Sequence, residues 1–357
     1  MKRHNFNSGP SILPDEVLRR ASEAVIDFNG LGLSILEIGH RTPWFTEVIE
    51  EGRSLVKELM GLDDTYSVLF LQGGATTQFM QVPLNLLPVG GHAAYIKNGI
   101  WGSKAIKEAS VFGQADVIGD TSDRNHSYIQ KTFSVPDGSS YLHYTSNNTV
   151  EGTQWHTLPE AGQTPLIADM SSDIFSRPVA FDKHALIYAG AQKNAGAAGT
   201  TIVAIKKDML GKTGRNISPI LDYEGHIKAE SMLNTPPVFA VYVSMLTMRW
   251  IKEQGGLAEM EKRAKQRADL FYSALDNLEV FTPIVDKQDR SLMNATFTTS
   301  NKDLEAPFLE LCKENAMVGV KGHRSVGGLR VSMYNAMPLS SVQALVDLME
   351  KFNQANK

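Results

Sequence analysis

The sequence predicts an α/β protein with a large domain, built on a mainly parallel sheet flanked by helices, and a smaller C-terminal α+β domain. Between residues 15 and 255, short apolar runs alternate with amphipathic stretches of helical periodicity. The runs show little polar–apolar alternation, which is expected for strands buried on both faces of a parallel sheet. From residue 256 on, charged helical stretches surround two β-rich runs. We therefore expect a large domain at residues 15–255 and a small domain at 256–357, which residues 1–14 join.

The expected elements follow in order along the chain. The predicted strands of the large domain are residues 68–71, 93–96, 166–168, 186–188 and 201–205, each an apolar run. Residues 237–254 predict a long helix that ends at the glycine pair 255–256. In the small domain we expect helices at 257–278 and from 340 onward, strands at 293–297 and 329–333, and one helix between these strands. A large domain followed by a small one leaves a cleft, where small-molecule sites are common.

Composition and charge exclude several classes of protein. The 357 residues carry a net charge of −4, so nothing favours binding to nucleic acid or to an anionic membrane. Cys312 is the single cysteine, which rules out an internal disulfide and fits a reducing compartment. The first residues lack the apolar core of a signal peptide, and the most apolar stretch, 238–248, is too short to span a bilayer. We expect a cytoplasmic protein in which a local cluster of positive groups holds any anionic ligand.

Lys193 is the strongest candidate for a reactive residue. It lies between two apolar runs, among glycines and alanines that would let a planar ligand approach the backbone closely. A lysine removed from water has a lowered pKa, as a Schiff-base lysine requires. A solvated loop lysine is the alternative, but residues 191–199 contain only Gln192 and Asn194 as further polar residues. The glycines do not form a nucleotide-binding phosphate loop, because that motif is absent.

Asp169 is the second candidate. It follows the apolar run at 166–168, so it should emerge at the carboxyl end of a strand, where ligands bind in open α/β sheets. An aspartate there can pair with the protonated pyridine nitrogen of pyridoxal phosphate (PLP). A helix N-cap before Ser171 and Ser172 explains the residue equally well by itself. The order of Asp169, an apolar run and then Lys193 favours the cofactor.

Three further features fit such a cofactor without requiring it. The glycine turn at 72–78 contains Ala75 and Thr76 and leads into a helix, whose N-terminus suits a phosphate; an ordinary strand-to-helix turn is the alternative. Trp101 has a glycine on either side and can stack on a ring or simply fill the core. Thr149 can bond the phenolic oxygen of the cofactor or stabilise a turn.

Two His-Arg pairs flanked by glycine, His40-Arg41 and His323-Arg324, are candidates for anion binding. Arginine offers a bidentate fork to a carboxylate or phosphate, and the adjacent histidine adds a donor. Solvated surface loops are the alternative for each pair. Arg330 begins an apolar run, a setting in which an arginine needs an anionic partner. We expect no metal, because no His/Cys cluster has metal-ligand spacing, and no hydrolase motif occurs.

Nearly the whole chain resembles the phosphoserine aminotransferase family, which belongs to the class V aminotransferases and to the PLP-dependent transferases of fold type I. The motifs that carry the resemblance are Phe6-Asn-Ser-Gly-Pro, Gly39-His-Arg41, Ala189-Gly-Ala-Gln-Lys-Asn194, Asn234-Thr-Pro-Pro237, Lys321-Gly-His-Arg324 and Tyr334-Asn-Ala-Met-Pro338. The last three are highly specific to this family within class V.

The resemblance implies a role for each candidate. The catalytic residues are Lys193, which binds PLP covalently and moves the proton at the substrate Cα, and Asp169 at the pyridine nitrogen. The other implied cofactor contacts are Trp101 on the ring, Thr149 at the phenolic oxygen, Ala75, Thr76 and Gln192 at the phosphate, and Asn234 and Thr235 reaching over from the second subunit of a homodimer. The implied substrate contacts are His40, Arg41, His323, Arg324 and Arg330, with Arg330 as the partner of the carboxylate.

The implied reaction is the reversible transfer of the amino group of L-glutamate to 3-phosphohydroxypyruvate, giving O-phospho-L-serine and 2-oxoglutarate in serine biosynthesis. Formation of 4-phosphohydroxy-L-threonine in pyridoxine biosynthesis is a second implied activity. Two alternatives stay open: another class V aminotransferase, such as the alanine–glyoxylate type, and a non-catalytic phosphoanion-binding protein on the same fold. A binding protein would not need Lys193. A cysteine desulfurase is disfavoured because Cys312 lies in a predicted helical stretch, 309–315, rather than in a flexible loop.

Overall fold

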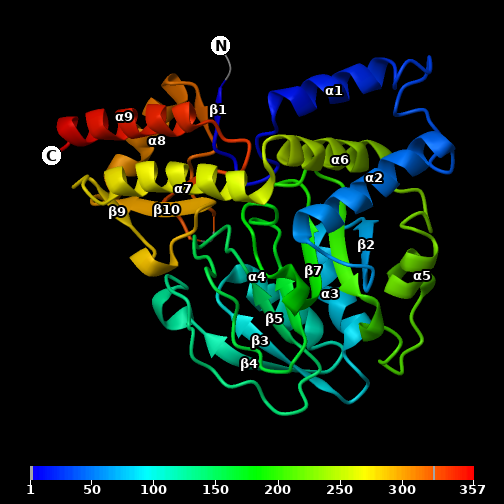
Figure 1. Cartoon of the computed structure of the whole chain (residues 1–357). Coiled ribbons are helices and arrows are strands. Elements are labelled where there is room, and N and C mark those ends of the chain that lie inside the picture. The colour runs from blue at the N-terminus through cyan, green and yellow to red at the C-terminus, as the bar shows by residue number, and fades with distance from the viewer. Residues whose placement is uncertain (1–2, 325) are drawn as a thin grey trace.

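A seven-stranded sheet lies at the centre of the protein (Figure 1), whose computed structural model describes residues 3–324 and 326–357. The strands follow one another across the sheet in the order β2 (Tyr66–Leu71), β8 (Thr201–Lys206), β7 (His184–Gly190), β6 (Leu166–Asp169), β5 (Leu142–Thr145), β3 (His92–Lys97) and β4 (Gln114–Asp120). Only β8 runs against its neighbours, and the other strands are parallel to one another. The predicted mainly parallel sheet is confirmed.

Both faces of the sheet are buried, because alternate residues of a strand pack into different apolar clusters. Ala94 and Ile96 of β3 pack on the face covered by α1 (Asp15–Ile26), α2 (Pro43–Met60) and α6 (Val238–Glu253). Ala93 and Tyr95 pack on the opposite face, covered by α3 (Gly74–Leu86), α4 (Ile100–Ala109) and α5 (Tyr223–Lys228). This double burial explains why the strands read as continuous apolar runs.

The C-terminal part has a core of its own. An antiparallel sheet of β12 (Leu329–Ser332), β10 (Asn294–Thr299) and β9 (Phe281–Pro283) packs against α7 (Gly256–Leu275), α8 (Glu305–Glu314) and α9 (Leu339–Ala355). The N-terminal strand β1 (His4–Asn5) pairs with β11 (Met317–Val318) beside this core, which also buries Phe6. Figure 1 shows these elements on one side of the large sheet. The domain boundary between residues 255 and 256 stays a prediction.

The predicted strands correspond to β2, β3, β6, β7, β8, β10 and β12, and the long predicted helix is α6. The sequence pattern misses β4, an edge strand with exposed positions, and β5, which has four residues and contains His143. Pairing with β3 makes these segments strands, and a local pattern does not reveal such pairing. Within the described ranges, no helix has both the length and the apolar character that crossing a membrane requires.

Candidate active site

Lys193 lies in the turn between β7 and β8, beyond the carboxyl end of β7. Its Nζ atom donates a hydrogen bond to Thr149 Oγ1 at 2.6 Å and lies 5.7 Å from the centre of the Trp101 ring. The N-terminal segment passes directly over the lysine. A Cβ on Gly9, whose φ is +138°, would lie 3.1 Å from Lys193 Cγ. This close approach and the positive φ favour glycine at the position.

The surroundings of the Lys193 amine favour its neutral form. Burial lowers the pKa of Lys193 to about 8, an effect that the charge of Asp169 opposes and the charge of Arg330 reinforces. The neutral amine is the nucleophile in Schiff-base chemistry, so the lowered pKa makes this lysine more reactive near neutral pH than an exposed one.

We expect the PLP-free chain to link covalently to added PLP at a rate that rises with pH through a midpoint near pH 8 and levels off above it. The neutral amine is the reacting form, and its fraction grows as the pH passes the lowered pKa of Lys193. Stopped-flow absorbance in the visible measures the rate, with Lys193→Ala as the blank. A midpoint near 10.5, the ordinary value for lysine, would contradict the argument from burial.

Asp169 ends β6 and is 3% exposed. Burial raises the pKa of Asp169, while hydrogen bonding from Ser171 and the charge of Lys193 lower it. Ser171 N donates to Asp169 Oδ1 at 2.9 Å, but the residues that follow form turns rather than a helix, so the N-cap interpretation is wrong. A buried carboxylate in this position suits a cationic partner such as a protonated pyridine nitrogen, which would stabilise its ionised form.

The glycine turn after β2 forms the start of α3. Gly73 has φ +91°, and a Cβ there would overlap the side chain of Thr77, so the turn depends on glycine. Because α3 begins at Gly74, the backbone N–H groups of its first turn have no partners within the helix. Ala75 and Thr76 line the cavity at this end. The turn can therefore hold an anion such as a phosphate.

Arg330 approaches the same cavity from β12 and is 8% exposed. Its Nη1 donates to Thr149 O at 3.0 Å and its Nη2 to Ser8 Oγ at 2.7 Å. Its Nε has no hydrogen-bond partner within the described part of the chain. Burial lowers the pKa of Arg330, but a guanidinium keeps its charge. The cation is thus held in place by neutral oxygens and retains its capacity to bind a carboxylate.

One cavity of about 400 Å³ brings most of the predicted residues together: Ala75, Thr76, Trp101, Thr149, Asp169, Gln192, Lys193, His323 and Arg330 line it. Ser8, Gly9, Asn147, Ser171 and Ser172 also line it and were not predicted. The motif at residues 6–10 was the signal that could have identified Ser8 and Gly9. A backbone conformation that requires glycine, as at Gly9, is adopted where the chain makes a close contact. The other three follow strands that end at the cavity.

The remaining predicted residues lie outside this cavity in the single chain. Asn234 lines a neighbouring cavity of about 350 Å³, and Thr235 follows it in the chain. His40 is half-buried, and its Nε2 has no hydrogen-bond partner in the ranges described. Arg41 and Arg324 are exposed. The roles implied for these residues therefore stay predictions.

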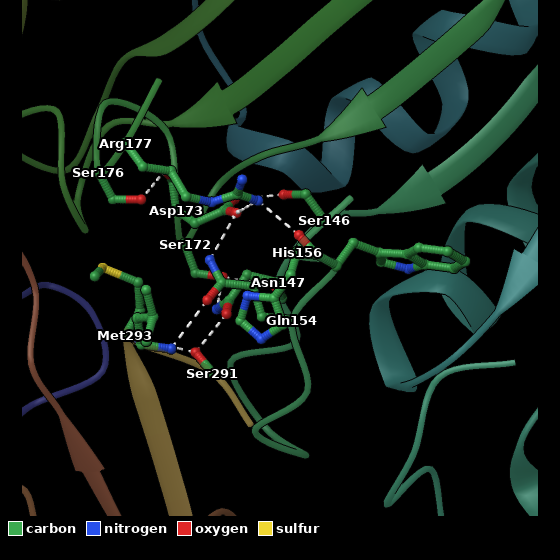
Figure 2. Close-up of polar contacts among 12 residues, drawn as sticks. Ser146, Asn147, Gln154, His156, Ser172, Asp173, Ser176, Arg177, Ser291 and Met293 are labelled. Carbon is green, nitrogen blue, oxygen red and sulfur yellow. Dashed lines mark hydrogen bonds and ion pairs between the residues drawn. The ribbon is translucent and has the colours of Figure 1, made fainter. Parts of the chain in front are cut away.

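A buried polar network supports the cavity wall beyond β6 (Figure 2). Gln154 Nε2 donates to Asp173 Oδ2 at 3.1 Å, and Asn147 Nδ2 donates to Ser172 Oγ at 2.8 Å. Ser291 Oγ donates to Asn147 Oδ1 at 2.5 Å and belongs to the segment that leads into β10. The network thus joins the large sheet to the C-terminal part, and satisfied buried polar groups favour a single arrangement.

This fold and this site define a PLP-dependent aminotransferase. The family described as aminotransferase class V matches residues 3–345, and the chain belongs to that family. Within it the chain groups with the phosphoserine aminotransferases. It is 52% identical to the phosphoserine aminotransferase of Flavobacterium johnsoniae over 98% of both chains. It is 50% identical to that of Phocaeicola vulgatus over 99% of both.

Solved structures agree with this assignment. Phosphoserine aminotransferase from Bacillus circulans subsp. alkalophilus superposes with a TM-score of 0.97 at 41% identity, covering 100% of this chain and 99% of that one. The PLP-bound phosphoserine aminotransferase from Trichomonas vaginalis gives 0.93 at 33% identity, covering 98% of this chain and 100% of that one. Alanine–glyoxylate aminotransferase from Nostoc sp. gives 0.76 at 17% identity, with 99% and 95% covered, and shares the fold alone.

PLP is the cofactor of this family, and the residues present fit it. The cavity volume of about 400 Å³ lies within the range of small-molecule sites. Lys193 offers a desolvated amine, Asp169 a buried carboxylate and the start of α3 an anion-binding turn. The Trp101 Nε1 has no hydrogen-bond partner within the described ranges, so this ring is held by packing and lies beside the lysine.

Proposed function

We propose that the chain catalyses the reversible transfer of the amino group of L-glutamate to 3-phosphohydroxypyruvate, giving O-phospho-L-serine and 2-oxoglutarate in serine biosynthesis. The observation that carries the proposal is the single cavity in which Lys193, Asp169 and Arg330 meet. The names of relatives at about 50% identity over nearly the whole chain support the choice of substrates.

Each of these residues has a distinct task in the reaction. When bound, PLP withdraws electrons from the substrate Cα and so makes its proton acidic. Lys193 holds the cofactor and, when its amine is free, removes and returns the proton at the substrate Cα. Thr149 orients that amine through the 2.6 Å hydrogen bond. Asp169 keeps the pyridine nitrogen protonated, and Arg330 orients the substrate through its carboxylate.

Positive groups near the mouth of the site favour a phosphorylated substrate. Burial lowers the pKa of His323, and the nearby charges of Arg330, Lys104 and Arg324 lower it further. His323 thus lies among cations, although the whole chain has a net charge of −4. Such a local excess of positive charge attracts a substrate with both a phosphate and a carboxylate.

The test is a comparison of amino acceptors with L-glutamate as donor. We expect 3-phosphohydroxypyruvate to be used far more efficiently than glyoxylate, with product formation followed by chromatography. Preference for glyoxylate would contradict the proposal and favour the alanine–glyoxylate type. A chain that binds phosphorylated acids without turning them over would favour the non-catalytic alternative.

We also infer a homodimer in which Asn234 and Thr235 complete the phosphate site of the partner subunit. The support is that both residues lie outside the cavity of their own chain while belonging to a motif specific to the family. Two-fold symmetry would then form two equivalent shared sites.

Co-expression of two inactive variants tests this inference. One chain carries Lys193→Ala and the other carries Asn234→Ala with Thr235→Ala. Half of the dimers formed at random are hybrids, and each hybrid has one intact site, so we expect about a quarter of the wild-type rate. A mixture that is no more active than the sum of the two variants would refute the shared site.

Two finer inferences accompany this proposal. The same site would accept the longer 3-hydroxy-4-phospho-2-oxobutanoate, leading to 4-phosphohydroxy-L-threonine in pyridoxine biosynthesis, and the acceptor comparison checks this when that acid is included.

A cytoplasmic location is supported by the single cysteine, Cys312, which is buried and free. Fractionation of the source cells tests this location. Recovery of the protein outside the cytosolic fraction would contradict it.

A further inference from the structure

Glu151 is a buried carboxylate beside the cavity that the mechanism above does not use. It is 5% exposed and follows Thr149 by two residues. Its Oε1 accepts a hydrogen bond from Ile100 N at 2.8 Å. Ile100 is the first residue of α4 and precedes Trp101, and the N-cap residue of this helix provides no side-chain bond. Glu151 therefore supplies the cap that α4 lacks, where an acidic group also suits the positive end of the helix.

The loop that carries Thr149 lies directly against this end of α4. A Cβ on Gly99 would lie 2.5 Å from Asn148 Oδ1 and 2.8 Å from Glu151 Oε2, so only glycine fits between the loop and the helix. Glu151 Oε2 has no hydrogen-bond partner in the part of the chain that the structure describes. The hydrogen bond from Ile100 N thus joins the Glu151 side chain to α4.

The backbone of Glu151 is tied to the strand pair that carries Arg330. Thr296 Oγ1 donates to Glu151 O at 2.7 Å, and Thr296 lies opposite Arg330 in the register of β10 and β12. A Cβ on Gly152, where φ is +90°, would lie 2.6 Å from Thr296 Oγ1. Arg330 itself donates to Thr149 O. One residue therefore contacts the helix of the ring-stacking tryptophan, the loop of Thr149 and the sheet of Arg330.

We propose that Glu151 is a positioning residue for the transamination: through its acceptor oxygens it fixes Trp101 and Thr149, which contact the cofactor, relative to Arg330, which contacts the substrate. This inference rests on the proposed function. What matters is the acceptor at Ile100 N rather than the charge. Burial raises the pKa of Glu151 while Arg330 lowers it, and the protonated carboxyl still offers an acceptor oxygen.

Two variants of Glu151 separate the effect of side-chain length from the effect of charge. Glu151→Gln keeps the length and an acceptor oxygen but removes the charge, whereas Glu151→Asp keeps the charge and is one methylene too short to reach Ile100 N. The measurements on each full-length holoenzyme are the visible circular dichroism of bound PLP, the PLP concentration that fills half of the sites, and kcat and KM. We expect the PLP concentration that fills half of the sites to stay within about twofold of the wild type in Glu151→Gln. In Glu151→Asp it should rise about 2- to 30-fold, the range for a lost cap. The dichroism of the Asp variant should also change.

Ile100→Pro is the second route to the same test. Proline is well tolerated at the first position of a helix but has no N–H, so it removes the donor without changing Glu151. We expect it to reproduce the effects of Glu151→Asp, including the altered dichroism. This keeps the inference testable if the Asp variant does not fold.

Three results would overturn the inference. They are a Gln variant impaired as much as the Asp variant, an Asp variant with wild-type PLP binding and dichroism, and an Ile100→Pro variant that folds with both unchanged. The proposed function fails separately, when the wild type binds PLP but does not transfer amino groups between L-glutamate and 3-phosphohydroxypyruvate.

Discussion

Lys193→Ala is expected to abolish the covalent attachment of PLP and to lower turnover by at least about 10²- to 10⁴-fold, the usual contribution of a general acid–base group. The reason is that, in the proposed mechanism, one amine, with a pKa lowered to about 8 by burial, both holds the cofactor and moves the proton at the substrate Cα. The measurements are the visible absorbance before and after borohydride, the mass of the reduced protein, and the steady-state rate with L-glutamate and 3-phosphohydroxypyruvate.

The control for this variant is Lys183→Ala, since Lys183 is exposed, does not line the cavity and precedes β7, whereas Lys193 lies beyond the other end of that strand. This control should retain the visible band, the mass increase after reduction and the full rate. A Lys193→Ala protein that keeps the borohydride-stable mass increase would mean that another lysine is modified. A variant that keeps full turnover would end the assignment of Lys193 as the catalytic residue.

The fold class could be predicted because double burial of the sheet leaves a signal in the sequence itself. The predicted runs of β2, β3, β6, β7 and β8 are apolar because their residues face one apolar cluster or the other. β4 leaves no such signal because most of its side chains are exposed or half-buried, and β5 is too short. Both become strands through pairing with β3, which depends on residues distant in sequence.

The residues of the candidate site also differ in whether the sequence predicts them. Lys193 and Asp169 were predictable because their neighbours are strand ends and small residues, which are local features. Ser8 and Gly9 have no such neighbours, and the motif at residues 6–10 is their only signal, because the N-terminal segment reaches the cavity across more than 180 residues of chain, as the bond from Ser11 Oγ to Lys193 O at 2.5 Å shows. Glu151 left no signal, since an isolated acidic residue in a loop is ordinarily solvated.

The arginine variants test substrate recognition. Arg330→Ala should lower kcat/KM about 10- to 150-fold for every amino-acid substrate, because charge-assisted bonds are worth about 1.5–3 kcal/mol and every such substrate has a carboxylate. Arg41→Ala and Arg324→Ala should act mainly on O-phospho-L-serine, because only that substrate adds a phosphate. Single-turnover conversion of bound PLP, followed by absorbance with O-phospho-L-serine, L-glutamate and L-alanine, measures each effect.

The comparison between substrates decides between phosphate recognition and other roles of these arginines. Arg263→Ala, which removes a half-buried partner of Glu259 on α7, is the matched control and should change none of the rates. If the Arg41 and Arg324 variants lose activity equally toward all three substrates, these residues stabilise the structure or bind the carboxylate. If the wild type converts L-alanine as readily as O-phospho-L-serine, phosphate binding does not determine specificity, and another class V transamination becomes the better proposal. An unchanged rate for Arg330→Ala with all substrates would mean that its bonds to Thr149 O and Ser8 Oγ are its whole role, as a tie between the N-terminal segment and the cavity wall.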